Sequence, residues 1–250
     1  FTTSSTGTVT SSGANTDTVI RSQKMTIANA INAGTGIVTL APFTTNTAIN
    51  MGSAVDTTAS TLEISDTEID LITAGKLRIG EDTSGAVTVS AAITPANTTT
   101  LAIRSGGNVT ASGSGTITVA NLGVKAAGTI SLGNNNSVTG NLALSASGAT
   151  VSFGQNSGTY TPAAVDGISA DFGVPTAITM SQVPTSTPQD AFMAVAFNPP
   201  PVATVKDKFG NSLATANVNR SAYALVASIA TSTTTSGTMV LAGTTKVTAT

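Results

Sequence analysis

The sequence predicts an all-β protein in which a parallel β-helix, with three short strands per coil of about 21 residues, precedes a small antiparallel β-sandwich. Three observations predict this fold. Apolar residues recur with that period, glycines keep a register of their own beside them, and small polar residues dominate the composition. A fixed period of this length is typical of a coil that stacks on copies of itself.

The apolar ladder consists of three series at three phases of the period. Its members are Leu101, Leu122 and Leu142; Val87, Val109, Ile130 and Val151; and Ile117 and Val138. Apolar-polar-apolar triplets such as Ile130-Ser131-Leu132 lie at these places. Period-two alternation then places the outer two side chains in the core and the middle one in solvent.

Glycine recurs two or three residues upstream of the second series. The four positions are Gly85, Gly107, Gly128 and Gly148. We expect the chain to turn a tight corner with positive φ at each of them, because glycine adopts that conformation without steric cost.

Composition excludes several classes of function. The 250 residues include no His, Cys or Trp, only 9% are charged, and the net charge is −2. The Lys and Arg residues form no basic patch, so nucleic acid is not an expected partner. No apolar run approaches the roughly 18 residues of a membrane-spanning helix. Without His or Cys there is no Ser-His or Cys-His pair, no histidine zinc site and no disulfide, so no cofactor is expected.

The N-terminal coils, residues 1–61, have a looser period. Two pairs of apolar residues stand 22 apart, namely Ile27 and Ile49, and Leu40 and Leu62. These spacings predict that the same coil repeats from the start of the chain. The regular coils are predicted over residues 77–153, after a helical turn at residues 65–75.

The helical turn has a clear beginning in the sequence. Ser65 is a suitable N-cap, and Glu68 stands at N3, where it completes a capping box. Ile64 and Ile69 have the spacing of a hydrophobic staple, and Gly75 is expected to end the turn in the αL conformation. We expect this turn to pack across the column.

Three carboxylates, those of Asp66, Glu68 and Asp70, stand within the helical turn. Clustered acids can act on polysaccharides or bind Ca²⁺, so the trio is a weak candidate for a Ca²⁺ site or an acid pair. The capping box and the polar first turn explain the same residues without a ligand. We therefore favour a structural role, with no catalytic residue.

Other conspicuous residues also favour structural roles. Asn121 and Asn141 stand one coil apart, before Leu122 and Leu142, and are predicted to form a stacked asparagine ladder rather than a ligand site. Asn134-Asn135-Asn136 is predicted to be a turn. Arg78 and Arg104 are expected on a solvated outer face, with contact to an acidic sugar as the alternative.

The period fails after about residue 171, where proline becomes frequent. We therefore expect two domains, the β-helix over residues 1–173 and the sandwich over residues 174–250. The predicted sandwich strands are 177–180, 191–197, 202–206, 223–229, 239–241 and 246–248, and a hairpin turn is predicted at 207–211. The sandwich is expected to be incomplete at its C-terminal edge.

Several segments resemble known families. The stretches TLEISDTEIDLITAGKLRIG (61–80), SGAVTVSAAIT (84–94), TTLAIRSGGNVTASGSGTITVANLGVKAAGTISL (99–132) and NNSVTGNLALSA (135–146) resemble the repeats of filamentous-haemagglutinin-like bacterial adhesins. This resemblance, over roughly residues 17–170, implies a right-handed parallel β-helix on a secreted or surface-anchored protein. PPPVATVKDKFGNSLATANV (199–218), with residues 224–250, resembles bacterial Ig-like domains that occur in tandem.

These features together favour a structural segment of a secreted or cell-surface bacterial adhesin or fibre, in an extracellular location. Expected partners are adjacent repeats of the same chain or head-to-tail copies, and a host receptor or surface polysaccharide is possible. One alternative is a polymerising extracellular filament subunit whose open sandwich edge is completed by strand donation. The other is a carbohydrate-active β-helix enzyme, which needs a groove lined by charged residues across several coils.

Overall fold

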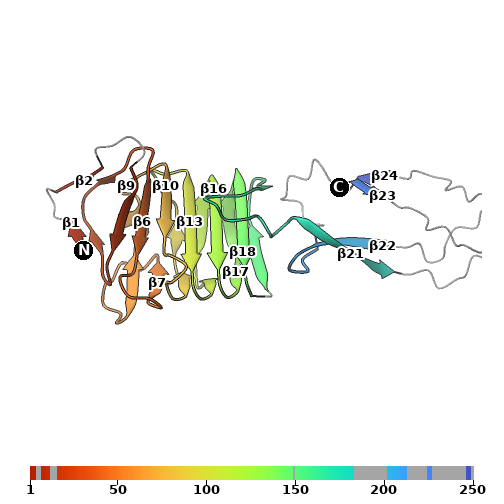
Figure 1. Cartoon of the computed structure of the whole chain (residues 1–250), viewed down its shortest axis with the longest axis horizontal. Helices are drawn as coiled ribbons and strands as arrows, with labels where there is room; N and C mark the ends of the chain where they lie inside the picture. The colour runs from red at the N-terminus through yellow and green to blue at the C-terminus, as the bar shows by residue number, and fades with distance from the viewer. Residues whose placement is uncertain are drawn as a thin grey trace, which may run out of the picture.

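The fold is known from a computed structural model, which describes residues 1–3, 7–11, 16–148, 150–182, 202–212, 224–226 and 246–248. The described chain is all-β and nearly without helix. A parallel β-solenoid of about seven turns forms a column, and a small antiparallel sheet continues beyond its C-terminal end (Figure 1). No helix in the described ranges is long and apolar enough to cross a membrane.

The elements of the column are short strands and a single helical turn. In chain order they are β1 (Thr2–Thr3), β2 (Val9–Thr10), β3 (Thr18–Arg21), β4 (Thr26–Ile27), β5 (Ile31–Asn32), β6 (Ile37–Ala41), β7 (Ala48–Met51), β8 (Thr61–Ile64), α1 (Asp66–Ile69), β9 (Ile72–Thr73), β10 (Lys76–Ile79), β11 (Val87–Val89), β12 (Ala92–Ile93), β13 (Thr100–Ser105), β14 (Val109–Ala111), β15 (Thr116–Val119), β16 (Asn121–Ala126), β17 (Ile130–Val138), β18 (Asn141–Ala146), β19 (Val151–Gln155) and β20 (Thr161–Pro162). The terminal strands are β21 (Pro175–Gln182), β22 (Val202–Asp207), β23 (Ala224–Val226) and β24 (Lys246–Thr248).

One face of the column is a seven-stranded parallel sheet in the order β20-β18-β16-β13-β10-β6-β3. Within it Leu101 is the partner of Leu122, and Leu122 is the partner of Leu142. All three side chains are buried in one continuous apolar core. The first predicted series of the ladder is therefore confirmed.

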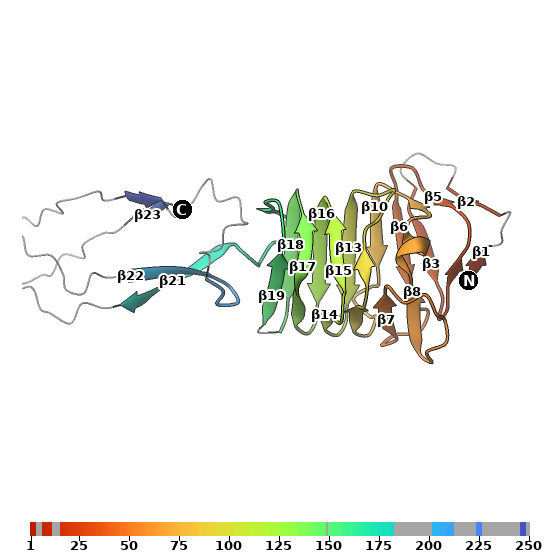
Figure 2. The same ribbon diagram turned by 180° about the vertical axis from the view of Figure 1, so that it is seen from behind.

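A second, eight-stranded sheet forms another part of the wall (Figure 2), and β2, β5 and β9 form a separate three-stranded sheet near the N-terminal end. The start of β17 pairs with β14 and β19, and its end pairs with β15. Consecutive pairs join Val87 to Val109, Val109 to Ile130 and Ile130 to Val151, which confirms the second series.

The third series differs from the prediction. Val138 pairs with Val119 and not with Ile117, so the step is two residues shorter than expected. Ile117 instead lies beside Asn136, whose Oδ1 accepts its N–H at 2.8 Å. The pairing of β17 with the following strand, β19, also shifts its register, between Leu132 and Asn136.

The early coils also differ from the prediction. Leu62 pairs with Ile49, whereas Leu40 pairs with Ile20 and Ile79, so the two 22-residue spacings do not join equivalent positions. After β7 the chain loops toward the N-terminal end of the column. There β8 pairs with β7 in parallel, on the side away from β11. The buried side chains of β8 close the core of the second sheet at this end.

The four repeated glycines have a different structural role from the predicted one. None of Gly85, Gly107, Gly128 and Gly148 has positive φ. A Cβ atom on Gly85 would lie 2.5 Å from the carbonyl oxygen of Asn46, and one on Gly148 would lie 2.6 Å from that of Gly128. The corners of successive coils therefore stack so closely that they leave no room for a side chain.

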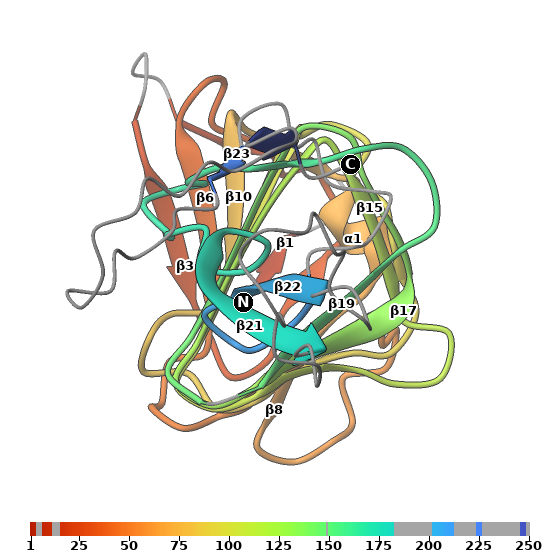
Figure 3. The ribbon, with the colours of Figure 1, turned by 90° about the vertical axis from the view of Figure 1, so that its right-hand side faces the viewer.

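The helical turn is shorter than predicted. α1 ends at Asp70, its C-cap, and β9 follows before Gly75 is reached. Gly75 does not have positive φ, so its predicted αL role is wrong; a Cβ atom there would run into the carbonyl oxygen of Thr35. α1 forms part of the wall between β8 and β9 and is not a plug across the column, and Ile64 and Ile69 are both buried (Figure 3).

The terminal strands form two antiparallel pairs, β21 with β22 and β23 with β24. The predicted strands 177–180, 202–206 and 246–248 coincide with β21, β22 and β24, and β23 falls within 223–229. The predicted strands 191–197 and 239–241 lie outside the described residues. At the predicted hairpin turn, Asp207 N donates to Asn211 O at 3.0 Å and Lys206 bridges Ser212 in antiparallel fashion.

The inward register can be tested by two adjacent substitutions in β17. Ile130→Asp places a charge in the apolar core, so we expect the free energy of unfolding to fall by at least about 4 kcal/mol. Ser131→Asp lies on the exposed side of the same strand and is expected to cost less than about 0.5 kcal/mol. Chemical denaturation measures both, and equal losses would contradict the register.

Candidate functional site

The three acidic residues of the helical turn connect coils to one another. Asp66 Oδ1 accepts the N–H of Thr94 at 2.6 Å, and Asp70 Oδ1 accepts that of Ala96 at 2.9 Å. Glu68 Oε1 accepts the N–H of Ile27 at 2.9 Å. The carboxylates thus supply acceptors for backbone donors that a regular strand would otherwise satisfy.

Glu68 also completes the capping box that the sequence predicts. Its Oε2 accepts the N–H of Ser65 at 2.9 Å, while Ser65 Oγ accepts the N–H of Glu68 at 3.3 Å. Within the described ranges, no group of three or more acidic side chains is placed to hold a metal ion. The arrangement at Asp66, Glu68 and Asp70 is that of a structural turn.

Asparagine side chains bond across coils along the column. Asn121 Oδ1 accepts the N–H of Asn141 at 3.0 Å, and its Nδ2 donates to Thr99 O at 3.3 Å. The contact therefore joins a side-chain amide to the backbone of the coil on either side, where the sequence predicted amide-to-amide stacking. Because Thr99, Asn121 and Asn141 belong to successive coils, one residue links three of them.

Asn136 has the same role inside the column; the turn predicted for Asn134-Asn135-Asn136 is wrong, because all three residues belong to β17. Its side chain is fully buried. Oδ1 accepts the N–H of Ile117, and Nδ2 donates to Leu132 O and Gly154 O, each at 2.9 Å. The predicted ladder places Val138 opposite Ile117, so the sequence offers no signal that Asn136 lies there.

A buried carboxylate closes the N-terminal end of the second sheet. Glu63 on β8 accepts from Ser53 Oγ at 2.9 Å and from Thr58 N at 3.1 Å, and Lys24 Nζ lies 3.8 Å away. Burial acts to raise the pKa of Glu63, but these hydrogen bonds and the lysine outweigh it and lower the pKa. The loop after β7 is thereby held against β8.

A short segment, residues 163–172, crosses the outer face of the seven-stranded sheet; we call it the strap. The strap is a tight reversal, in which Val165 and Ile168 exchange backbone hydrogen bonds of 3.1 and 2.8 Å. Asp166 and Gly167 at its tip both have positive φ. Val165 and Ile168 pack on Ala102 and Ala143, which the sequence placed in solvent but which are buried.

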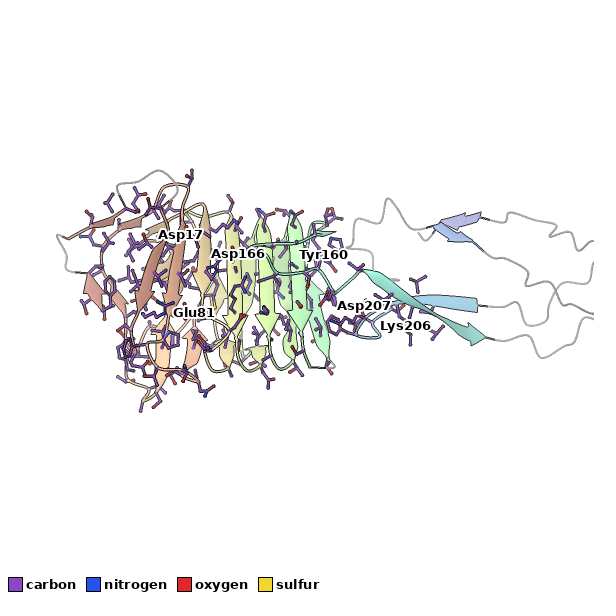
Figure 4. All side chains as sticks on the ribbon, viewed as in Figure 1. Asp17, Glu81, Tyr160, Asp166, Lys206 and Asp207 are labelled. Atoms are coloured by element: carbon purple, nitrogen blue, oxygen red, sulfur yellow. The ribbon has the colours of Figure 1, made fainter. Side chains whose placement is uncertain are left out.

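The tip of the strap carries the most buried ion pair of the described chain, at Asp166 (Figure 4). Arg78 binds both carboxylate oxygens, Nε to Oδ2 at 2.8 Å and Nη2 to Oδ1 at 2.9 Å. Lys76 Nζ lies 3.7 Å from Oδ1, and Arg104 Nη2 donates to the backbone oxygen of Asp166 at 2.7 Å. The side chain of Asp166 is only 3% exposed.

The expectation that Arg78 and Arg104 lie on a solvated face is therefore wrong. Their side chains are 25% and 18% exposed, because the strap covers them. The hydrogen bond to Asp166 raises the pKa of the Arg78 guanidinium, so that side chain is charged at every accessible pH. No pattern in the sequence indicates that residue 166 returns to strands so far back in the chain.

Two further acidic residues lie beside the strap. Asp82 accepts from Lys125 at 2.5 Å, a bond that lowers the pKa of its carboxyl group. Asp171, at the end of the strap, accepts from Ser145 Oγ at 2.8 Å and from Lys208 at 3.1 Å. Burial opposes ionisation of Asp171, yet these bonds outweigh it and lower the pKa.

The C-terminal end of the column is closed by aromatic rings. Phe153 meets Tyr160 and Phe172 edge to face, with ring centroids 5.9 and 6.3 Å apart. Asp207 Oδ2 then accepts the N–H of Gly173 at 3.1 Å, and Asn211 Nδ2 donates to Val151 O at 3.0 Å. The turn after β22 is thus bonded to the last coils (Figure 4).

Each of these clusters uses its polar groups for bonds between coils or between the column and its covering segments. Carboxylates accept backbone N–H groups, amides bridge three coils, and the strap carries the buried charge. No protein-family model, curated protein or solved structure matches the chain. The interpretation of function therefore depends on the geometry of the column.

The bridging role of Asn136 predicts a large cost for its removal. Asn136→Ala leaves the buried N–H of Ile117 without its acceptor, so we expect a loss of about 2 kcal/mol in the free energy of unfolding. The matched control is Asn135→Ala, at an exposed neighbouring position, which is expected to cost less than about 0.5 kcal/mol. Chemical denaturation compares them, and equal stability of the two variants would contradict the bridge.

The lowered pKa of Glu63 predicts acid sensitivity. The folded state favours the ionised carboxylate, so this stabilisation is complete above the ordinary glutamate pKa of about 4.3 and is lost as pH falls through the lowered value. We expect Glu63→Gln to flatten the fall of unfolding free energy below about pH 4.3. Glu81→Gln, which removes the surface partner of Arg21, is the control, and parallel curves for Glu63→Gln and the unaltered chain would contradict the assignment.

Proposed function

We propose that the chain is a rigid structural segment of a large secreted or cell-surface bacterial adhesin or fibre, a stalk or filament repeat used in adhesion or in the building of a biofilm matrix. One observation supports this above others: side chains bond neighbouring coils to one another along the axis, at Asn121, Asn136 and the acids of α1. Such bonds stiffen a column without forming a reactive cluster. A solenoid with this bonding is suited to bearing load along its length.

The finer features of the fold belong to the same proposal. We take the solenoid to be right-handed, with three strands per coil, as in filamentous-haemagglutinin-like repeats. The three runs of parallel pairing from β13 to β19 support this interpretation. We take the part of the chain after residue 173 to be an Ig-like sandwich, supported by the antiparallel pairs β21–β22 and β23–β24.

The partners follow from the two ends of the column. β3 and β20 are the edge strands of the seven-stranded sheet, and each pairs on one side only among the described elements. An edge strand offers backbone donors and acceptors to another strand. We propose that an adjacent repeat or a second copy joins there, outside the cell, while a host receptor or surface polysaccharide is a second kind of partner.

A head-to-tail filament subunit is a second candidate, favoured by the same open edges. Electron microscopy of the purified chain at several concentrations separates the two. A stalk segment is expected as single particles at every concentration, and a polymerising subunit as filaments that lengthen with concentration.

The mechanical role itself can be tested by pulling. The chain, held between two marker domains in a single-molecule force experiment, is expected to resist extension until a distinct unfolding step. Ile130→Asp, which disrupts the core, is the control and is expected to yield at lower force. Uncoiling of the unaltered chain without any resistance would contradict the proposal, as would cleavage of an acidic polysaccharide that Asp66→Ala or Asp70→Ala abolishes.

A further inference from the structure

We infer that the strap, residues 163–172, is a clamp that makes four successive coils open as one unit, with Asp166 as its fastener. The strap leaves the column after β20 and reaches Arg78 on β10, so it passes over β18, β16 and β13. In the sheet, the four strands β10, β13, β16 and β18 pair only with their immediate neighbours. A solenoid whose coils contact only adjacent coils can open one coil at a time, and a segment that spans several coils prevents this.

The outer face of the sheet is shaped to receive the strap. The outward positions beneath it are Ala102, Gly123 and Ala143, which are adjacent partners in the sheet. A Cβ atom on Gly123 would lie 3.1 Å from both Ile168 Cδ1 and Val165 O. Exposed strand positions ordinarily favour β-branched or aromatic residues, so three small residues in a row are explained by the segment that lies over them.

The charges fix the position of the strap along the column. Asp166 is held from β10 by Arg78 and Lys76 and from β13 by Arg104. At the other end of the strap, the N–H groups of Asp171 and Phe172 donate to Leu144 O on β18, both at 3.2 Å. The strap is therefore fastened at both ends of the four strands that it covers.

Burial makes the fastener sensitive to loss of one partner. The Asp166 side chain is 3% exposed, so removal of its charge leaves the largely covered guanidinium group of Arg78 without its hydrogen-bonded counter-ion, whereas Arg104 keeps Asp82 at 3.5 Å. The pair of Asp82 and Lys125 lies on the same face, but both side chains are about half exposed, at 52% and 45%. That surface pair contributes little and is screened by salt.

Two variants test the clamp by independent routes. Asp166→Asn removes the charge at the tip, and Gly123→Val obstructs the strap from below without touching the charge. Valine suits an uncovered strand better than glycine, so Gly123→Val is expected to stabilise the column if the strap has no role and to expel the strap if it has one. Asp82→Asn is the matched control on the same face.

The readouts are arginine labelling by phenylglyoxal and amide hydrogen exchange, both followed by mass spectrometry. In Asp166→Asn and Gly123→Val we expect labelling of Arg78 and Arg104 to accelerate at least about tenfold, and β13, β16 and β18 to exchange faster than β6. Asp82→Asn removes a partner of Arg104 but none of Arg78, so labelling of Arg78 and exchange of the strands are expected to match those of the unaltered chain. If Asp166→Asn does not fold, Gly123→Val decides, and slow labelling with unchanged exchange in that variant would overturn the inference.

The clamp depends on the proposed mechanical function only for its biological purpose. A pulling experiment tests the clamp and the mechanical function separately. A clamped column is expected to lose the region of residues 76–172 in one step, and Gly123→Val to lose it in smaller successive steps. Weak resistance of the unaltered chain, together with faster labelling in the variants, would reject the stalk and keep the clamp. Strong resistance that Gly123→Val leaves unchanged would reject the clamp and keep the stalk.

Discussion

Parallel pairing in register is the constraint on which the rest of the structure depends. Each inward residue lies directly on its equivalent in the next coil, as Leu101, Leu122 and Leu142 do. Because side chains alternate between the two faces of a strand, a slip of one residue would exchange core and surface over the whole strand. The corners must follow the same spacing, and this explains why Gly85 and Gly148 lie against the backbone of the coil before them.

Polar side chains accept hydrogen bonds from backbone N–H groups that the strand pairing leaves without a partner. Where β17 shifts its register, Asn136 accepts the N–H of Ile117 that a regular strand would have paired. Where α1 interrupts the wall, Asp66 and Asp70 bind the amides of the following coil. Buried backbone groups need partners, so each irregularity of the solenoid is matched by a side chain that supplies one.

The outer face of the column carries contacts between coils that are not adjacent. Nearest-neighbour contacts alone give a column that can fray from either end. The strand β8 is the last strand at the N-terminal end of the eight-stranded sheet. The aromatic rings of Phe153, Tyr160 and Phe172 cover the other end of the column. The strap adds a contact that spans several coils. Such a contact distributes load over several coils, which suits the mechanical role proposed above.

The sequence by itself determined the parallel solenoid, the phases of two of the three series and the start of the helical turn. All of these are encoded locally, by alternation within a strand, by a constant period and by the capping box at Ser65 and Glu68. Only the tertiary structure decided on which side of β7 the strand β8 lies, the slipped partner of Val138 and the burial of Arg78 under Asp166. The apolar spacing in the sequence is the same whether the next strand lies on the C-terminal side or, as β8 does, on the N-terminal side of the strand before it. An ion pair between residues 88 positions apart leaves no trace in either chain segment until folding brings them together.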